Sequence, residues 1–191
     1  MKAIVPTLLL PALLFAACDS KKDTAHEHGT QAKTEAPADT VKKSIPKEEH
    51  ALVGGTHFTV AYHAPAVRGR TIWGGLVPYG EVWVTGAHSA TSIEFNKDIN
   101  INGTRVPAGK YAVFTIPGKD GWTVIINKNW NQHLADDYDA KEDVVRVDVA
   151  PTVLPSLQER LKYTIVDKGN TTASMDIRWE FVNISLPITL L

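Results

Sequence analysis

The stretch VVRVDV, residues 144–149, alternates apolar and polar side chains with a period of two. In an extended chain its alternate valines fall on one face, and Arg146 and Asp148 fall on the other. The stretch TSIEFNKD, residues 91–98, repeats the pattern. Alternation of this kind is typical of a β-strand with one face in a core and one in water. These two stretches therefore predict a sheet that is covered on one side.

The rest of the C-terminal part of the chain extends this pattern. Further strands are predicted at HFTVAYH (57–63), KYAVFTI (110–116), WTVIINK (122–128), RLKYTIV (160–166) and SMDIRWEFV (174–182). Between them lie turn sequences, of which Asn102-Gly103 is the strongest hairpin signal. Eight or nine short strands with almost no helical periodicity predict an all-β fold, an antiparallel, jelly-roll-like β-sandwich.

Length and charge limit the classes of protein. The chain has 191 residues, 43% of them hydrophobic, and a formal net charge of −1. A chain of this length forms one sizeable core and is too short for two ordinary domains. Its lysines and arginines are scattered instead of gathered in one stripe, so no electrostatic surface for nucleic acid is expected. We predict one folded domain and no nucleic-acid partner.

The N-terminal stretch MKAIVPTLLLPALLFAACDS is typical of an export signal. One lysine precedes an apolar run that is too short to span a bilayer. The run ends in LFAAC, which resembles the bacterial lipobox. We predict a lipoprotein signal peptide at residues 1–17 and a fatty acid such as palmitate on Cys18. The alternative is an unmodified cysteine in an ordinary signal peptide.

Residues 18–53 differ sharply in composition from the C-terminal part of the chain. They contain no aromatic residue and few large apolar ones, and charges of both signs are interspersed. Such a segment buries too little apolar area to offset its chain entropy. We therefore predict a disordered linker at residues 18–53 and a folded domain at residues 54–191. Together these predictions describe an exported protein anchored in a membrane of the bacterial cell envelope, inner or outer.

The stretch NKNWNQHLADDYDAKED, residues 127–143, interrupts the strand pattern. Its length and polarity predict a loop with a turn of helix. The acidic side chains from Asp136 to Asp143 are of the type that binds calcium, and His133 lies close by. The spacing lacks the alternate ligands and central glycine of an EF-hand loop, so a solvated acidic loop is preferred. No metal or cofactor is predicted.

The glycine-rich stretch GGLVPYGEVWVTGAHSA, residues 74–90, is the best candidate for a site. If a strand begins at Glu81, a bulge at Gly86 would turn His88 toward Arg70 at the rim of the sandwich. The preferred interpretation is a corner of the sandwich, in which the glycines make turns and the aromatic side chains fill the core. The candidate binding residues are Arg70, Tyr79, His88 and Glu94.

Two longer segments carry a family resemblance. GRTIWGGLVPYGEVWVTGAHSAT (69–91) and NINGTRVPAGKYAVFTIPGKDGWTVIINK (100–128) resemble the signature of the domain-of-unknown-function family numbered 2911. The resemblance covers residues 56–188 and implies an envelope protein, frequently a lipoprotein, of no established activity. The family pattern usually has Arg where Val84 stands and Asn where His88 stands. The imidazole of His88 keeps a polar, hydrogen-bonding side chain there.

Two classes of function remain. The preferred one is a noncatalytic, lipid-anchored module that binds a small molecule, glycan or protein. The alternative is a hydrolase-like enzyme in which His88 or His133 acts with Glu94 or Asp136 as acid and base. The chain has no nucleophile-elbow, phosphate-loop or zincin motif, so any catalytic site would combine residues from several strands and loops.

Overall fold

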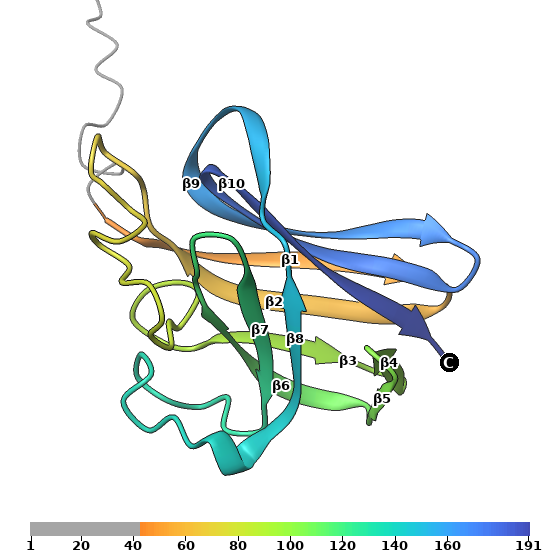
Figure 1. Ribbon diagram of the computed structural model, residues 1–191. Coiled ribbons are helices and arrows are strands. Elements are labelled where there is room, and N and C mark those ends of the chain that lie inside the picture. The colour runs from red at the N-terminus through yellow and green to blue at the C-terminus, as the bar shows by residue number, and fades with distance from the viewer. Residues whose placement is uncertain (1–42) are drawn as a thin grey trace, which may run out of the picture. The chain divides into compact units, whose positions relative to one another are not determined.

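The computed structural model describes residues 43–191, which form ten β-strands and one short 3₁₀ helix (Figure 1). Six strands form the larger antiparallel sheet, in the order β1 (Ile45–Val53), β2 (Thr56–Ala64), β3 (Thr91–Phe95), β6 (Gly109–Ile116), β7 (Trp122–Asn127) and β8 (Asp143–Val149). Four form the smaller one, in the order β5 (Thr104–Val106), β4 (Ile99–Ile101), β10 (Thr172–Leu190) and β9 (Thr152–Gly169). The prediction of an all-β, antiparallel sandwich is confirmed.

The core lies between the two sheets and results from the period-two pattern. In β8, Val145 and Val147 are buried while Arg146 is exposed, as the alternation predicts. Aromatic side chains from the facing sheets meet inside, where the ring centroids of Tyr62 and Tyr163 lie 4.7 Å apart. Burial of this apolar surface is the main contribution that holds the sheets together.

The Asn102-Gly103 hairpin also forms where the sequence predicts it. The two residues have φ angles of 50° and 81° and connect β4 to β5. Positive φ at both central residues defines the type I′ turn, whose twist matches that of the paired strands. This turn is therefore fixed by local chemistry.

The linker prediction is wrong for residues 45–53, which form β1 and pair with β2 over nine residues. This edge strand raises the strand number to ten, against eight or nine predicted. Lys47 and Glu49 lie on the inward side at the sheet edge, so the apolar alternation is broken. Backbone pairing with β2 holds the strand without many apolar side chains. The signal peptide and Cys18 lie outside the described residues.

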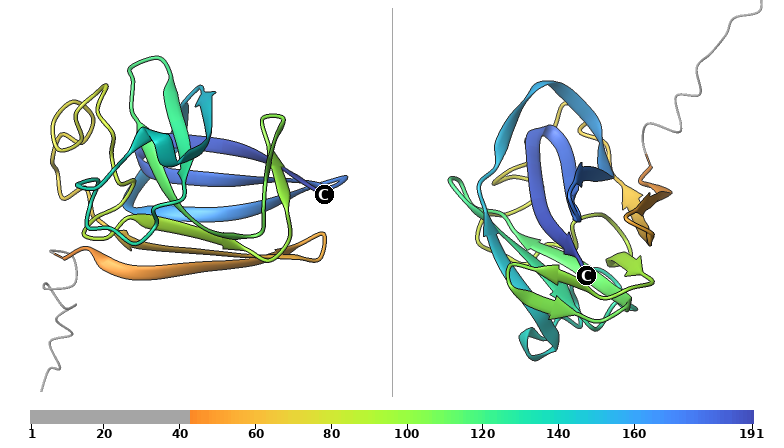
Figure 2. Two further views of the ribbon diagram at one scale, coloured as in Figure 1. Left: turned by 90° about the horizontal axis from the view of Figure 1, so that it is seen from below. Right: turned by 90° about the vertical axis from the view of Figure 1, so that its right-hand side faces the viewer.

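Directly after β2, the chain leaves the larger sheet and pairs with β9 of the smaller sheet. The backbone N–H of Val67 donates to the carbonyl of Glu159 at 2.8 Å, and that of Leu161 donates to the carbonyl of Pro65 at 3.0 Å. Residues 65–90 then run as a long loop. This loop and residues 128–142 lie at the same end of the sheets, away from the C-terminus (Figures 1 and 2).

A small second core lies on the outer face of the larger sheet. Ala112, Phe114 and Ile125 are buried there with Val84 and Ala90. The loop from residue 128 to 142 covers part of this second core and ends in a 3₁₀ turn at Ala140–Glu142. The predicted loop with a turn of helix is therefore confirmed, and its packing makes it a fixed part of the fold.

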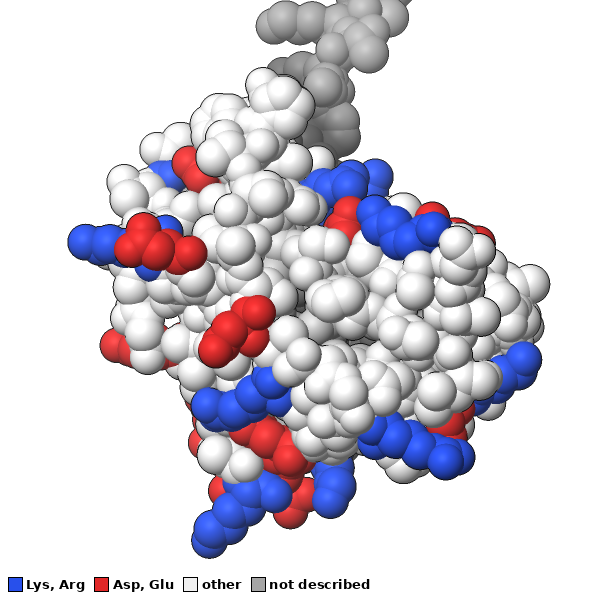
Figure 3. Space-filling view, turned by 45° about the vertical axis from the view of Figure 1, so that its right-hand side comes forward, with Lys and Arg blue, Asp and Glu red and all other residues white. Residues whose placement is uncertain are grey.

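The face seen in Figure 3 carries acidic and basic side chains in neighbouring positions around a centre that is free of charged groups. No helix within residues 43–191 has the length and apolar character needed to cross a membrane.

Candidate functional site

Residues 81–88 form an irregular segment, so the strand from Glu81 that the site hypothesis assumes does not form. Only Trp83 forms a bridge, in which its N–H donates to Thr115 O at 2.8 Å and its O accepts from Thr115 N at 3.0 Å. The chain turns at Thr85 and His88, which have φ angles of 52° and 65°. These left-handed conformations take the backbone out of the sheet.

Gly86 provides space at this turn. A Cβ atom on Gly86 would lie 2.7 Å from Oγ1 of Thr91, and its φ is not positive. The predicted bulge is thus replaced by turns at its neighbours. The carbonyl of Thr85 is fixed by two donors, the Tyr163 hydroxyl at 2.7 Å and the Thr91 hydroxyl at 3.0 Å. Both hydrogen bonds are buried, which makes the turn rigid.

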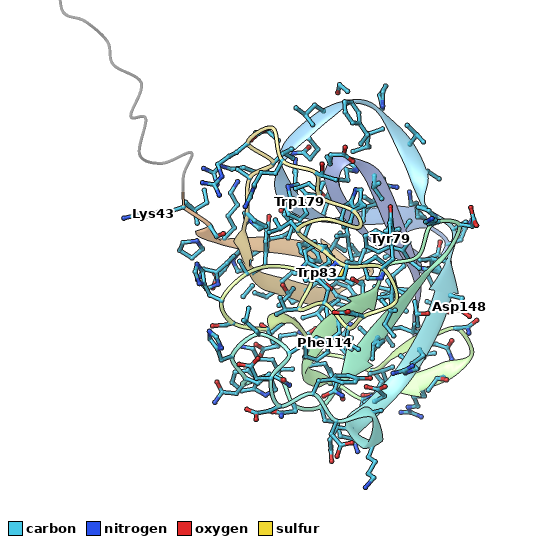
Figure 4. All side chains as sticks on the ribbon, turned by 60° about the vertical axis from the view of Figure 1, so that its left-hand side comes forward. Lys43, Tyr79, Trp83, Phe114, Asp148 and Trp179 are labelled. Carbon is cyan, nitrogen blue, oxygen red and sulfur yellow. The ribbon has the colours of Figure 1, made fainter. Side chains whose placement is uncertain are left out.

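Four tryptophans from distant parts of the chain gather beneath this turn. The rings of Trp83 and Trp179 stack with centroids 5.6 Å apart, and Trp73 meets Trp122 edge to face at 4.8 Å. Trp122 and Trp179 are buried, whereas Trp73 and Trp83 are half-buried against the core. Figure 4 shows Trp83 and Trp179 inside the domain. Through Trp73 and Trp83, the cluster attaches the loop of residues 65–90 to Trp122 and Trp179 of the core.

A cavity of about 460 Å³, called here the Arg70 cavity, adjoins this cluster. Its apolar wall consists of Leu76, Val77, Trp83, Val84, Leu134 and Trp179. Its basic or titratable side chains are Lys43, Arg68, Arg70 and His88. No Asp or Glu is among the described residues that line it. The cavity therefore combines an apolar wall with positive charge.

Arg70 is held in place by its own loop. Its Nε donates to the carbonyl of Val67 at 3.1 Å, and its Nη2 donates to that of Ala66 at 2.6 Å. Both acceptors are neutral, and Arg70 makes no ion pair with a carboxylate of the described residues. A guanidinium that is oriented but not neutralised is suited to a carboxylate or phosphate.

A second cavity of about 570 Å³, called here the Trp130 cavity, lies on the outer face of the larger sheet. Its charged or aromatic side chains include Glu48 from β1, His63 from β2, Lys110 from β6 and Trp130 from the loop after β7. The Lys110 ammonium lies 4.2 Å from the centroid of the Trp130 ring. Groups of both charge signs thus line this cavity.

A short wall separates the two cavities. The backbone of residues 88–90 pairs with that of residues 132–134, with Leu134 N donating to His88 O at 2.7 Å and Ala90 N to Gln132 O at 3.0 Å. Of the paired residues, His88 and Leu134 line the Arg70 cavity, whereas Ala90 and Gln132 line the Trp130 cavity.

A histidine pair links the two cavities. His63 lines the Trp130 cavity and His88 lines the Arg70 cavity, and their rings meet edge to face with centroids 5.2 Å apart. Burial, and then the neighbouring His88, lower the pKa of His63 below its usual value of 6.5. The His63 imidazole is therefore neutral at pH 7, with one nitrogen as donor and the other as acceptor.

The structure brings two of the four predicted site residues together, since Arg70 and His88 line one cavity. Tyr79 packs against Gly74 instead and remains 40% exposed. Glu94 stands on the outer face of β3 in register with Lys110, and it lines neither cavity. Tyr79 and Glu94 are thus separate from the Arg70 cavity.

Two lining residues of the Trp130 cavity, Trp130 and Gln132, are not among the site residues predicted from the sequence. A signal was available for Trp130, because NKNWNQH places this tryptophan among polar residues of a loop, where a core residue is not expected. Trp130 is 40% exposed. Gln132 has no comparable signal, because its burial depends on the docking of the loop against residues 88–90.

The acidic loop contains one histidine–carboxylate pair. Nδ1 of His133 lies 2.9 Å from Oδ2 of Asp136, and the two side chains are 68% and 64% exposed. Within residues 43–191, no three His, Cys, Asp or Glu side chains gather as metal ligands. Water surrounds this pair, which weakens the electrostatic coupling that an acid–base pair needs.

One comparison with known proteins gives a match. The family model described as a protein of unknown function, DUF2911, matches residues 36–188. No curated protein and no solved structure matches the chain.

Proposed function

The chain belongs to the DUF2911 family of proteins of unknown function, and we propose that it is a noncatalytic binding module whose ligand is a small anionic molecule with an apolar part. The observation that carries the proposal is the Arg70 cavity, where basic side chains face an apolar wall. Its volume of about 460 Å³ lies within the range of small-molecule sites.

The two halves of such a ligand match the two halves of the cavity. Arg70 offers N–H donors in a fixed orientation to a carboxylate or phosphate. Leu76, Val84 and Leu134 offer apolar surface to a chain or ring. The indole ring of Trp179 extends this apolar surface.

The same cavity argues for binding over hydrolysis. Acid–base hydrolysis by His88 would need a carboxylate or a second acid within hydrogen-bond reach. The described lining contains none. The His133–Asp136 pair is exposed to water and is not part of either cavity lining. The noncatalytic class therefore needs fewer additional assumptions than the hydrolase-like alternative.

We further propose that the module is held on a membrane of the bacterial cell envelope through a fatty acid on Cys18. The proposal is supported by the short apolar run ending in LFAAC and by the polar composition of the residues after Cys18. Replacing Cys18 with Ser should abolish incorporation of labelled palmitate and release the protein from membranes. Unchanged labelling of Cys18→Ser would exclude this anchor.

Isothermal titration calorimetry of the chain from residue 36 onward, where the family match begins, tests the ligand class. We expect octyl phosphate to bind one to one, and octan-1-ol and inorganic phosphate to bind more weakly, because each offers only half of the match. Arg70→Met should weaken octyl phosphate by about tenfold or more, the effect of a lost charge-assisted hydrogen bond.

Arg70→Met also removes two hydrogen bonds to the loop, so its folding must be checked. Arg70→Lys keeps the charge, and Arg105→Met removes an exposed arginine that pairs with Asp98 on β4–β5, outside the lining of the cavity. Arg105→Met should bind like the parent. Equal binding of octyl phosphate by Arg70→Met and the parent, or no binding by the parent, would refute the proposal.

A further inference from the structure

The floor of the Trp130 cavity is built from small side chains. Across the outer face of the larger sheet, Glu48 of β1 is in register with Ala61 of β2, Ala61 with Ser92 of β3, and Ser92 with Ala112 of β6. Alanine and serine project little from the sheet. Ala61 and Ser92 therefore form a low floor between taller side chains on each side.

Polar and aromatic groups form the walls. On one side stands Glu48, whose Oε2 lies 3.2 Å from Nε2 of His50. On the other side stand Lys110 and Trp130, the ammonium above the indole ring. His63 closes one end with a neutral imidazole. The cavity thus offers acceptors, donors and an apolar ring surface together.

Gln132 provides the second, independent observation. Its side chain is 7% exposed and lines the cavity. Its Nε2 donates to the carbonyl of Asn129 at 2.7 Å, while its Oε1 has no hydrogen-bond partner among the described residues. A buried acceptor without a donor costs free energy unless a bound group supplies the donor. A ligand hydroxyl that reached this oxygen would supply the missing donor.

From these contacts we propose that the Trp130 cavity is a carbohydrate-binding site. A sugar has hydroxyl groups that both donate and accept, which suits Glu48, Lys110 and the amide of Gln132 at once. The C–H face of its ring packs on the exposed part of the Trp130 indole. The floor of Ala61 and Ser92 leaves room for a flat ring against the sheet.

The charge pattern separates this site from the Arg70 cavity. There, the charged lining is basic and selects an anion. Here, a carboxylate, that of Glu48, lies among the lining residues together with the basic residues Lys47 and Lys110. A neutral polyhydroxyl ligand uses groups of both signs through hydrogen bonds. The proposal does not depend on the function proposed for the Arg70 cavity.

Calorimetric titration with maltotriose, cellotriose and tri-N-acetylchitotriose tests the proposal. We expect at least one of these trisaccharides to bind one to one. Trp130→Ala should weaken its binding by about tenfold, because the apolar stacking surface is lost. Trp130→Phe should recover part of the affinity, which separates loss of stacking from misfolding.

Tyr79→Ala is the matched control, because Tyr79 is an aromatic residue with the same 40% exposure and lies outside the cavity. It should bind the trisaccharide like the parent. Equal affinity of Trp130→Ala and the parent would overturn the proposal, and so would the failure of all three trisaccharides to bind at millimolar concentration.

Discussion

The two cavities lie on opposite sides of one short wall, yet they are built from different parts of the fold. The Arg70 cavity rests on Trp83 and Trp179, which also belong to the packing between the sheets. The Trp130 cavity rests on small side chains of an outer sheet face, and its tryptophan stands on a loop. Substitutions in the floor of the Arg70 cavity therefore also affect the core. Substitutions in the lining of the Trp130 cavity should have little effect on the core.

Tryptophan substitutions give the sharpest separation. Trp179 is 2% exposed and contacts Trp73 and Trp83, so Trp179→Ala should lower the free energy of unfolding by about 3 to 5 kcal/mol. Trp130→Ala should change it by less than about 1 kcal/mol, because the ring is partly in water. Urea unfolding measures both values. Similar losses in the two variants would contradict the difference drawn between the cavities.

Two glycines test the turn between the cavities. A Cβ at Gly86 would meet Oγ1 of Thr91 at 2.7 Å and the carbonyl of His63 at 3.4 Å. Gly86→Ala should therefore cost about 1 to 3 kcal/mol. Gly121→Ala is the control, because nothing lies within 4 Å of its Cβ position, and it should stay within about 0.5 kcal/mol of the parent. A parent-like melting temperature for Gly86→Ala would show that the turn at Thr85 is not rigid.

Substitution of one member of the histidine pair should have a smaller effect, a change in the pKa of the other member. His88→Asn keeps a side chain that tolerates the left-handed backbone and removes the imidazole beside His63. The pKa of His63 should then rise toward 6.5, as measured by NMR titration of its ring protons. An unchanged His63 pKa in His88→Asn would show that burial alone lowers it.

The sign of the accompanying stability change is given by linkage. Because the folded-state pKa of His63 lies below its unfolded value of 6.5, the folded protein binds fewer protons in that interval. Its contribution to stability is present above pH 6.5 and is lost as the pH falls through the folded-state pKa. His88→Asn should lose less stability than the parent over the same range, in thermal melts between pH 8 and pH 5.

The features that the sequence predicted correctly depend on local rules. The strand at Val145 and Val147 results from alternation, and the turn at Asn102-Gly103 results from two residues that accept positive φ. Edge strand β1 does not obey such rules, because its pairing with β2 is made by the backbone and its side chains remain partly polar.

The candidate site was only partly predictable from the sequence. The proximity of Arg70 and His88 is predicted correctly, but from a bulge at Gly86 that the structure does not contain. The bend lies at Thr85 and His88, where non-glycine residues take a conformation that sequence patterns rarely reveal. The wall that divides the cavities needs residues 88–90 and 132–134, which are distant in sequence and pair only after folding.

The most direct test of two separate cavities is an NMR titration that monitors the five indole N–H signals. Octyl phosphate should shift the signals of Trp83 and Trp179, which line the Arg70 cavity, and leave that of Trp130 in place. A bound trisaccharide should shift Trp130 and leave Trp179 unchanged. If both ligands shift the same signals, or if octyl phosphate shifts Trp130 alone, the division into an anion cavity and a sugar cavity is wrong.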